Sequence, residues 1–168
     1  IVDISGDFRL GEEGVFNGDK CIFMAPPAKF VPGQMTDLFN WMKQNKKTVH
    51  PLILSSVFHY EFEFIHPFSD GNGRVSRLLT LLLLYKEGYD IGKYISFENQ
   101  INKYKGNYYD VLERCQKHWH ESKNTYYPFI EFTFQILYQC YKEINRRVIK
   151  TKSGKDKKNE RIEAAVLD

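Results

Sequence analysis

The chain has 168 residues, which is the size of one ordinary domain and enough to bury a hydrophobic core. Its 42% hydrophobic and 27% charged residues are typical of a folded globular protein and exclude an intrinsically disordered chain. The longest strongly apolar run, residues 78–85, is too short to span a membrane, and the start lacks the pattern of a signal peptide. Three widely spaced cysteines without a CxxC pair predict neither a disulfide framework nor a zinc site, and they favour a reducing, cytoplasmic location.

The net charge of +3 is unevenly distributed along the chain. Residues 141–168 hold nine Lys and Arg against five Asp and Glu, a net of +4, so the rest of the chain is near neutral. A basic tail can attract nucleic acid or anionic surfaces, but it is more often a solvated helix end or linker. We therefore expect a main domain over residues 1–150 and a basic tail or linker over residues 151–168, which could lead to a further C-terminal domain. Because the first residue is Ile1 rather than Met, we also expect a piece of a longer protein.

The first predicted element is a β-hairpin over residues 15–23. Apolar residues flank Asn17-Gly18, a pair that tolerates the positive φ values of a tight turn. Prolines and a glycine over residues 26–33 then interrupt regular structure. After them the apolar spacing becomes helical, because Met35, Leu38, Phe39 and Met42 form one stripe.

Two strongly apolar helices are predicted next, over residues 51–65 and 73–87. Pro51 suits the first turn of a helix whose apolar residues cover most of its circumference, so we expect this helix to be central and buried. Gly88 suits the C-terminal end of the second helix.

Three further helices complete the predicted fold. Ser96 is expected to cap one of them, and another is predicted over residues 108–117. A long helix that opens at Thr125 and Pro128 keeps an apolar stripe as far as Val148. The prediction is an all-α bundle with one small hairpin.

The most informative stretch is the loop between the two apolar helices, which reads HPFSDGNGRVSR over residues 66–77. A loop held between buried helices is a rigid place for polar side chains. Gly71 and Gly73, on either side of Asn72, leave backbone N–H groups unobstructed at the start of the next helix, where the helix dipole favours an anion. This arrangement predicts an anion nest that suits phosphate.

The side chains around this nest supply the other parts of a nucleotide-phosphate site. Arg74 and Arg77 are three residues apart in the first turns of the helix, so both guanidinium groups can bind phosphate oxygens. Asp70 offers a hard oxygen for Mg2+, and His66 can accept a proton from an attacking hydroxyl near neutral pH. Taken singly, each residue also suits a loop that merely caps a helix; together they favour phosphoryl or nucleotidyl transfer.

Residues 66–77 match the signature of the Fic family, His-x-Phe-x-(Asp/Glu)-Gly-Asn-Gly-Arg-x-x-Arg, at every fixed position. The resemblance also includes residues 6–9, 25–41 and 59–65, and it covers about residues 5–150. It implies a Fic-type helical bundle with a hairpin flap. It further implies a protein adenylyltransferase that transfers AMP from ATP, with Mg2+, to a Ser, Thr or Tyr hydroxyl of a target protein.

The resemblance implies a role for each residue of the motif. His66 would be the base that deprotonates the target hydroxyl, and Asp70 would hold Mg2+ on the α- and β-phosphates. Arg74 and Arg77 would hold the β- and γ-phosphates. The anion hole would consist of Gly71, Asn72 and Gly73, with Asn72 near the α-phosphate.

Two more features of the family have counterparts in this sequence. The hairpin matches the family flap, which would align a segment of the target protein by β-strand addition. Its residues that would dock the target are Val15, Phe16, Cys21, Ile22 and Phe23. Tyr108 falls where family members place a tyrosine beside the nucleoside.

Family members are often inhibited by a short helix with the pattern (Ser/Thr)-x-x-x-Glu-(Gly/Asn), whose Glu pairs with the second arginine, here Arg77. No Ser or Thr of this chain is followed by Glu four residues later. The inhibitory helix is therefore absent, lies in a segment upstream of this sequence, or is supplied by a partner protein, and we expect that this chain is not self-inhibited. It implies no membrane partner and nucleic acid binding only through a missing domain, and it leaves the oligomeric state open, a homo-oligomer included.

Three other functions fit parts of the sequence. Relatives with the same fold transfer another nucleotide or a phosphoryl group. His59, Glu63 and His66 share one helical face and could ligate a metal, although no HExxH motif is present and the same spacing suits a hydrogen-bonded core histidine at position 59. The basic tail could lead to a DNA-binding domain, which would make the whole protein a regulator.

Overall fold

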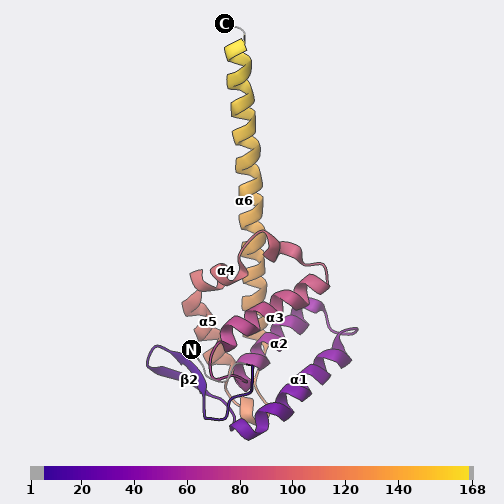
Figure 1. Ribbon diagram of the computed structural model, residues 1–168, viewed down its shortest axis with the longest axis vertical. Coiled ribbons are helices and arrows are strands. Elements are labelled where there is room, and N and C mark those ends of the chain that lie inside the picture. The colour runs from indigo at the N-terminus through magenta and orange to yellow at the C-terminus, as the bar shows by residue number, and fades with distance from the viewer. Residues whose placement is uncertain (1–5, 167–168) are drawn as a thin grey trace.

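The computed structural model describes residues 6–166, and it describes the side chains of residues 6–151. It is a helical bundle with one two-stranded hairpin near the N-terminal end (Figure 1). In chain order the elements are β1 (Gly14–Asn17), β2 (Lys20–Met24), η1 (Ala28–Phe30), α1 (Val31–Asn45), α2 (Pro51–Ile65), α3 (Asn72–Lys86), η2 (Asp90–Lys93), α4 (Phe97–Lys103), α5 (Lys105–Cys115), η3 (Trp119–Glu121) and α6 (Tyr127–Val166). This arrangement confirms the predicted all-α bundle with a small hairpin.

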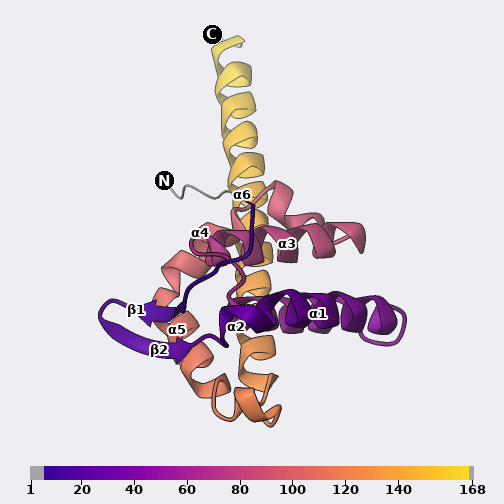
Figure 2. The same cartoon turned by 60° about the horizontal axis from the view of Figure 1, so that its bottom comes forward.

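The helix α2 is the central element, as its apolar circumference predicts. It contacts α1, α3 and α6, which surround it in Figures 1 and 2. Its large buried side chains are Phe58, Tyr60, Phe62 and Phe64, none of them more than 1% exposed. Because α2 is packed on all sides, the loop that follows its last residue is held in a fixed place.

The helix α3 begins one residue earlier than predicted, at Asn72, and packs along α2. Gly88 follows its end with φ +84°, a value in the left-handed region that favours glycine, so the predicted stop is confirmed. Ser96 caps α4, as predicted, by accepting a hydrogen bond from the Asn99 N–H. The candidate site therefore lies between the last residue of one buried helix and the first residue of another.

The hairpin is antiparallel and has its tight turn at Gly18-Asp19, one residue later than the Asn-Gly pair suggests. Of these residues only Gly18 has a positive φ, +60°, as in a type II′ turn. The register shifts between Val15 and Phe16. On the inner side Phe23 packs its ring 4.4 Å from that of Phe64, which fastens the hairpin to α2.

The helix α6 is longer than its apolar stripe predicts. Its first part packs against α2, α4 and α5, and its last part extends away from the bundle (Figure 1). The backbone remains helical to Val166, through the segment predicted as a basic tail or linker. The charged side chains of that segment beyond residue 151 lie outside those described. Within the described residues, no helix is both long and apolar enough to cross a membrane.

The helix α5 starts at Lys105 rather than at residue 108, and it ends at Cys115 rather than at residue 117. A single residue, Tyr104, separates it from α4. The Tyr104 N–H donates to the Ile101 carbonyl at 3.0 Å, so a tight turn at Tyr104 divides the two helices. The nearest glycine, Gly106, lies inside the first turn of α5 and so does not mark the position of the break itself.

Candidate active site

The loop of residues 66–71, between α2 and α3, carries the candidate active site. His66 caps the end of α2 with a left-handed backbone, at φ 51° and ψ 62°. This conformation costs a residue with a side chain about 1–2 kcal/mol, so neighbouring contacts must hold it in place. The His66 N–H donates to the Phe62 carbonyl at 3.0 Å.

Arg9 fixes the other end of the His66 peptide. Arg9 is only 2% exposed; its Nε donates to the His66 carbonyl at 2.6 Å, and its Nη2 donates to the Ile65 carbonyl at 3.3 Å. The same side chain also donates to the carbonyls of Pro26 and Gly11. The sequence did not single out Arg9 as a site residue, although Arg9 belongs to residues 6–9, which share the resemblance to the Fic family. It joins the N-terminal segment, the segment after the hairpin and the loop of residues 66–71.

The His66 side chain has a defined tautomer. Its Nδ1 lies 3.1 Å from the Glu63 carbonyl oxygen. A carbonyl oxygen can only accept, so Nδ1 carries the proton and Nε2 is left with a free lone pair. His66 is therefore oriented to take up a proton at Nε2.

The start of α3 offers backbone N–H groups to an anion. Gly71 has φ +83°, which favours glycine, and Asn72 and Gly73 follow it in the first turn, where N–H groups have no partner within the helix. The side-chain amide of Asn72 is already engaged: its Oδ1 accepts from the Phe68 N–H at 2.9 Å, and its Nδ2 donates to the Phe68 carbonyl at 2.6 Å. What Asn72 offers an anion is thus its backbone, while its side chain closes the loop.

Four charged side chains flank this helix start in two ion pairs. Arg74 Nη2 lies 3.0 Å from Asp70 Oδ2, and both side chains are largely exposed. Arg77 Nη2 lies 3.0 Å from Glu98 Oε1 of α4, and the Arg77 side chain is only 18% exposed. Glu98 did not stand out in the sequence, because only the tertiary structure brings α4 next to α3.

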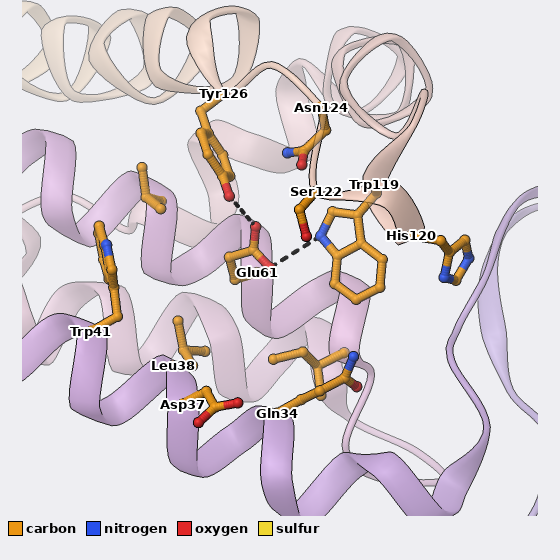
Figure 3. Close-up of a pocket in the computed structure, with 12 residues that line it drawn as sticks. Gln34, Asp37, Leu38, Trp41, Glu61, Trp119, His120, Ser122, Asn124 and Tyr126 are labelled. Carbon is orange, nitrogen blue, oxygen red and sulfur yellow. Dashed lines mark hydrogen bonds between the residues drawn. The ribbon is translucent and has the colours of Figure 1, made fainter.

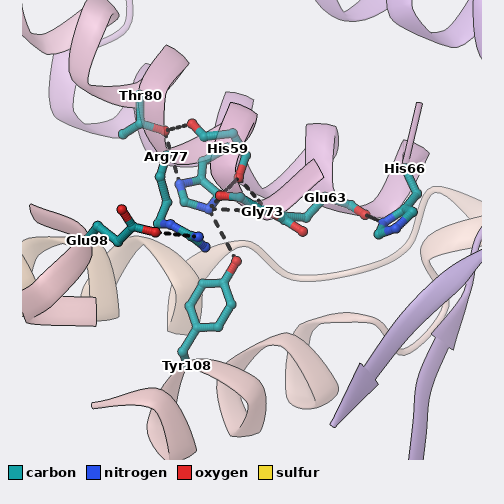
Figure 4. A network of polar contacts seen from close by, with 9 residues as sticks. His59, Glu63, His66, Gly73, Arg77, Thr80, Glu98 and Tyr108 are labelled. Atoms are coloured by element: carbon teal, nitrogen blue, oxygen red, sulfur yellow. Dashed lines mark hydrogen bonds and ion pairs between the residues drawn. The ribbon is translucent and has the colours of Figure 1, made fainter. Parts of the chain in front are cut away.

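A buried polar network lies behind the site (Figure 4). Ser76 donates to the carboxylate of Glu63, and Thr80 donates to the Ser76 carbonyl at 2.7 Å. The Thr80 oxygen then accepts from His59 Nδ1 at 3.0 Å, so His59 Nε2 faces the Tyr108 hydroxyl, 3.3 Å away, as an acceptor.

Burial shifts the pKa values of this network toward the uncharged forms. Burial lowers the pKa of His59 to about 3, with a smaller contribution from the nearby Arg77 charge. Burial raises the pKa of Glu63, although the hydrogen bond from Ser76 lowers it in part. Burial also raises the pKa of Tyr108. His59 is thus the hydrogen-bonded core histidine that its spacing suggests.

These positions bear on the alternative metal site. Within the described residues, no three His, Cys, Asp or Glu side chains are close enough to hold a metal ion. His59 is part of the buried network, whereas His66 is only partly buried and lies at the end of α2 (Figure 4).

The structure gathers the predicted nucleotide-site residues around one cavity of about 370 Å3. Its lining includes every residue predicted for catalysis or nucleotide binding: His66, Asp70, Gly71, Asn72, Gly73, Arg74, Arg77 and Tyr108. Glu13, Gly14, Glu63, Ser69 and Tyr109 also line it. Tyr108 is only 5% exposed, so most of its side chain is packed in the core.

The predicted flap residues divide between this cavity and the core. Val15 and Phe16 of β1 line the cavity. Ile22 and Phe23 of β2 are buried beneath the hairpin, and Cys21 is exposed. Only the first strand of the hairpin thus borders the candidate site.

Comparisons with known proteins agree with this geometry. The sequence model of the Fic/DOC family matches residues 1–84, which is half of the chain. A probable protein adenylyltransferase from Aquifex aeolicus is 44% identical over 66 residues, covering 39% of this chain and 20% of that protein. The protein adenylyltransferase Fic of Drosophila yakuba is 43% identical over 104 residues, covering 59% of this chain and 19% of that protein.

Solved structures are similar over more of the chain. The crystal structure of a Fic family protein from Desulfovibrio desulfuricans has a TM-score of 0.74 and 39% identity, and it matches 88% of this chain and 43% of its own. A Fic domain containing signaling protein from Bacteroides thetaiotaomicron has a TM-score of 0.63 and 25% identity, over 80% of this chain and 52% of its own. This chain spans about a fifth of the two curated relatives named above. By its motif, its fold and these matches, the chain belongs to the Fic/DOC family.

Proposed function

We propose that this protein is a protein adenylyltransferase, which transfers AMP from ATP to a Ser, Thr or Tyr hydroxyl of a target protein. The observation that carries the proposal is one cavity in which a proton-accepting His66 Nε2, the N-terminal turn of α3 and the first strand of the hairpin meet. Relatives named protein adenylyltransferases support it at the level of the family.

The groups around this cavity can account for each bond change and proton transfer of the reaction. The target hydroxyl oxygen attacks the α-phosphorus of ATP and forms a new P–O bond, while its proton passes to His66 Nε2. The bond between the α-phosphorus and the bridging oxygen breaks, and pyrophosphate leaves. The backbone N–H groups of Asn72 and Gly73 stabilise the charge that develops on the α-phosphate oxygens. Arg74 and Arg77 bind the β- and γ-phosphates.

The residues present fit a Mg2+ ion bound together with ATP. Mg2+ in nucleotide sites is held by one or two carboxylates plus phosphates and waters rather than by a cage of side chains. Asp70 supplies such a carboxylate at the cavity, and its side chain is 67% exposed, so the contact with Arg74 can be exchanged. Bound there, the ion would neutralise phosphate charge.

The flap is the proposed docking place for the target. Strand β1 borders the cavity, and a two-stranded hairpin has free edges to which an extended segment can add. The exposed Phe16 ring lies on this strand. A segment paired there would present its hydroxyl near His66.

Regulation and location are part of the same proposal. An inhibitory partner protein, or a segment outside this sequence, would act at Arg77, and co-purification followed by mass spectrometry tests for it.

A reducing, cytoplasmic location is supported by three cysteines that stay unpaired in the described residues.

Labelling with ATP tests the proposed reaction. The protein is incubated with cell extract and Mg2+, and with ATP labelled at either the α- or the γ-phosphate. We expect protein bands labelled from the α-phosphate, lost in His66→Ala and retained in His118→Ala, whose exposed ring is outside the cavity. Bands labelled from the γ-phosphate instead would make the protein a phosphoryl transferase and refute AMP transfer.

A further inference from the structure

A second cavity, of about 460 Å3, lies on another face of α2 (Figure 3). It is lined by residues of α1, α2, η3 and the segment that leads into α6, and it is open to solvent. It shares no lining residue with the candidate active site. Glu61 lines this cavity and Glu63 lines the other, because two residues turn a helix by about 200°.

A carboxylate lies at the centre of this cavity. Glu61 Oε2 accepts a hydrogen bond from Trp119 Nε1 at 3.0 Å, and Oε1 accepts one from the Tyr126 hydroxyl at 2.6 Å. A carboxylate has about four lone-pair positions, so each oxygen can accept at least one more donor. Burial raises the pKa of Glu61, while both hydrogen bonds oppose this and favour the charged form.

The described residues supply no cation to this carboxylate. Glu61 forms no ion pair among them, and neither Lys nor Arg lines the cavity. A second carboxylate, that of Asp37, stands at the opposite wall on α1 (Figure 3). The acidic and basic side chains that line the cavity are therefore the two carboxylates and the imidazole of His120.

The walls of the cavity suit a cation that is organic rather than a metal ion. Trp41 and Trp119 contribute indole rings from opposite sides, and Tyr126 adds a third aromatic ring (Figure 3). Aromatic faces attract ammonium and guanidinium groups that come within about 6 Å of the ring centre. Gln34 adds an amide whose Oε1 is buried and accepts no hydrogen bond within the described residues, and a side-chain rotation would present it to an N–H donor.

We propose that this cavity binds an organic cation, whose ammonium or guanidinium group pairs with Glu61 and lies against Trp41 and Trp119. Its volume is in the range of small-molecule sites, and it fits a diamine or the side chain of a lysine or arginine. The cation could be a free amine or a side chain of another protein, and the chemistry of recognition is the same.

Intrinsic fluorescence gives a direct test, because Trp41 and Trp119 are the two tryptophans of the chain and both line the cavity. The folded protein is titrated at low, matched ionic strength with agmatine, with 1,5-diaminopentane and with 1-pentanol as the uncharged analogue. We expect a saturable change in tryptophan emission with the two cations and none with the alcohol.

Variants separate the proposed site from unspecific binding. We expect Glu61→Gln to weaken agmatine binding at least tenfold, and Glu87→Gln, an exposed glutamate outside the cavity, to leave it unchanged. If circular dichroism shows that Glu61→Gln is unfolded, Asp37→Asn at the exposed rim replaces it, with an expected loss of at least threefold. Equal binding by the Glu61 variant, or no saturable change with either cation, would overturn the proposal.

Two further measurements identify the source of the cation and show whether its binding depends on the catalytic site. A capped tripeptide Gly-Arg-Gly that binds more tightly than agmatine indicates a protein side chain, and the reverse order indicates a free amine. His66→Ala should bind agmatine with unchanged affinity. The result therefore does not depend on whether the protein transfers AMP.

Discussion

Arg9→Lys tests how the N-terminal segment holds the loop of the candidate active site. The substitution keeps the positive charge but removes the planar fork that donates to four backbone carbonyls, two of them at Ile65 and His66. A single lysine nitrogen cannot reach all of these oxygens. The left-handed backbone of His66 would then keep the hydrogen bond at its N–H but lose the one at its carbonyl.

The size of the effect follows from the number of hydrogen bonds lost. A hydrogen bond to a charged group contributes about 1.5–3 kcal/mol, so losing two of the four costs about 3–6 kcal/mol. With a typical urea slope of about 2 kcal/mol/M, the midpoint of unfolding would fall by about 1.5–3 M. A displacement of His66 by about 1 Å would in addition lower the transfer rate about 100-fold.

Urea unfolding followed by tryptophan fluorescence measures the first quantity, and labelling from α-phosphate ATP at a temperature where both proteins are folded measures the second. Arg114→Lys, at an exposed position of α5, is the matched control and should change stability by less than about 0.5 kcal/mol. An unchanged midpoint for Arg9→Lys would refute the idea that this guanidinium holds the loop.

Three more predictions concern the site and its support. Glu98→Gln releases Arg77, and because partly exposed ion pairs contribute about 0.2–1 kcal/mol, calorimetry should show ATP affinity rising about 1.4- to 5-fold. An equal gain for AMP would contradict a role of Arg77 at the outer phosphates. Gly71→Ala, at φ +83°, should lose about 1–2 kcal/mol in thermal unfolding, whereas Gly11→Ala, which has open space around it, should not. The pKa of His59 is lowered to about 3 in the folded protein, whereas in the unfolded chain it is about 6.5. Between these two pH values the unfolded chain therefore binds one proton more than the folded protein does. This histidine therefore lowers stability as pH falls from about 6.5 toward 3, and His59→Gln should show a weaker loss between pH 7 and 5 than the parent protein does.

The sequence was sufficient for the fold class and for the composition of the candidate site. The apolar circumference of residues 51–65 predicted a central helix, since only a helix packed on all sides can bury so many apolar side chains. The motif over residues 66–77 named the residues that later line one cavity, because they are neighbours in the chain and a short loop cannot separate them. Gly88 and Ser96 marked helix ends through local backbone and capping preferences.

The sequence was not sufficient where the partner of a residue is distant in the chain. Arg9 meets His66 across 57 positions, and Arg77 meets Glu98 across 21, so no local pattern announces either contact. The break between α4 and α5 was not predicted from the sequence either, because the turn at Tyr104 is held by a backbone hydrogen bond.

The cavity around Glu61 illustrates the same division most clearly. In the sequence, its residues are scattered and lie outside the motif of residues 66–77: Trp41, Glu61, Trp119 and Tyr126. The packing of α1, η3 and the start of α6 against α2 brings them together. Local preferences and short-range spacing thus determined the helices and the motif loop, whereas burial and long-range packing decided which side chains share a cavity and what charge it carries.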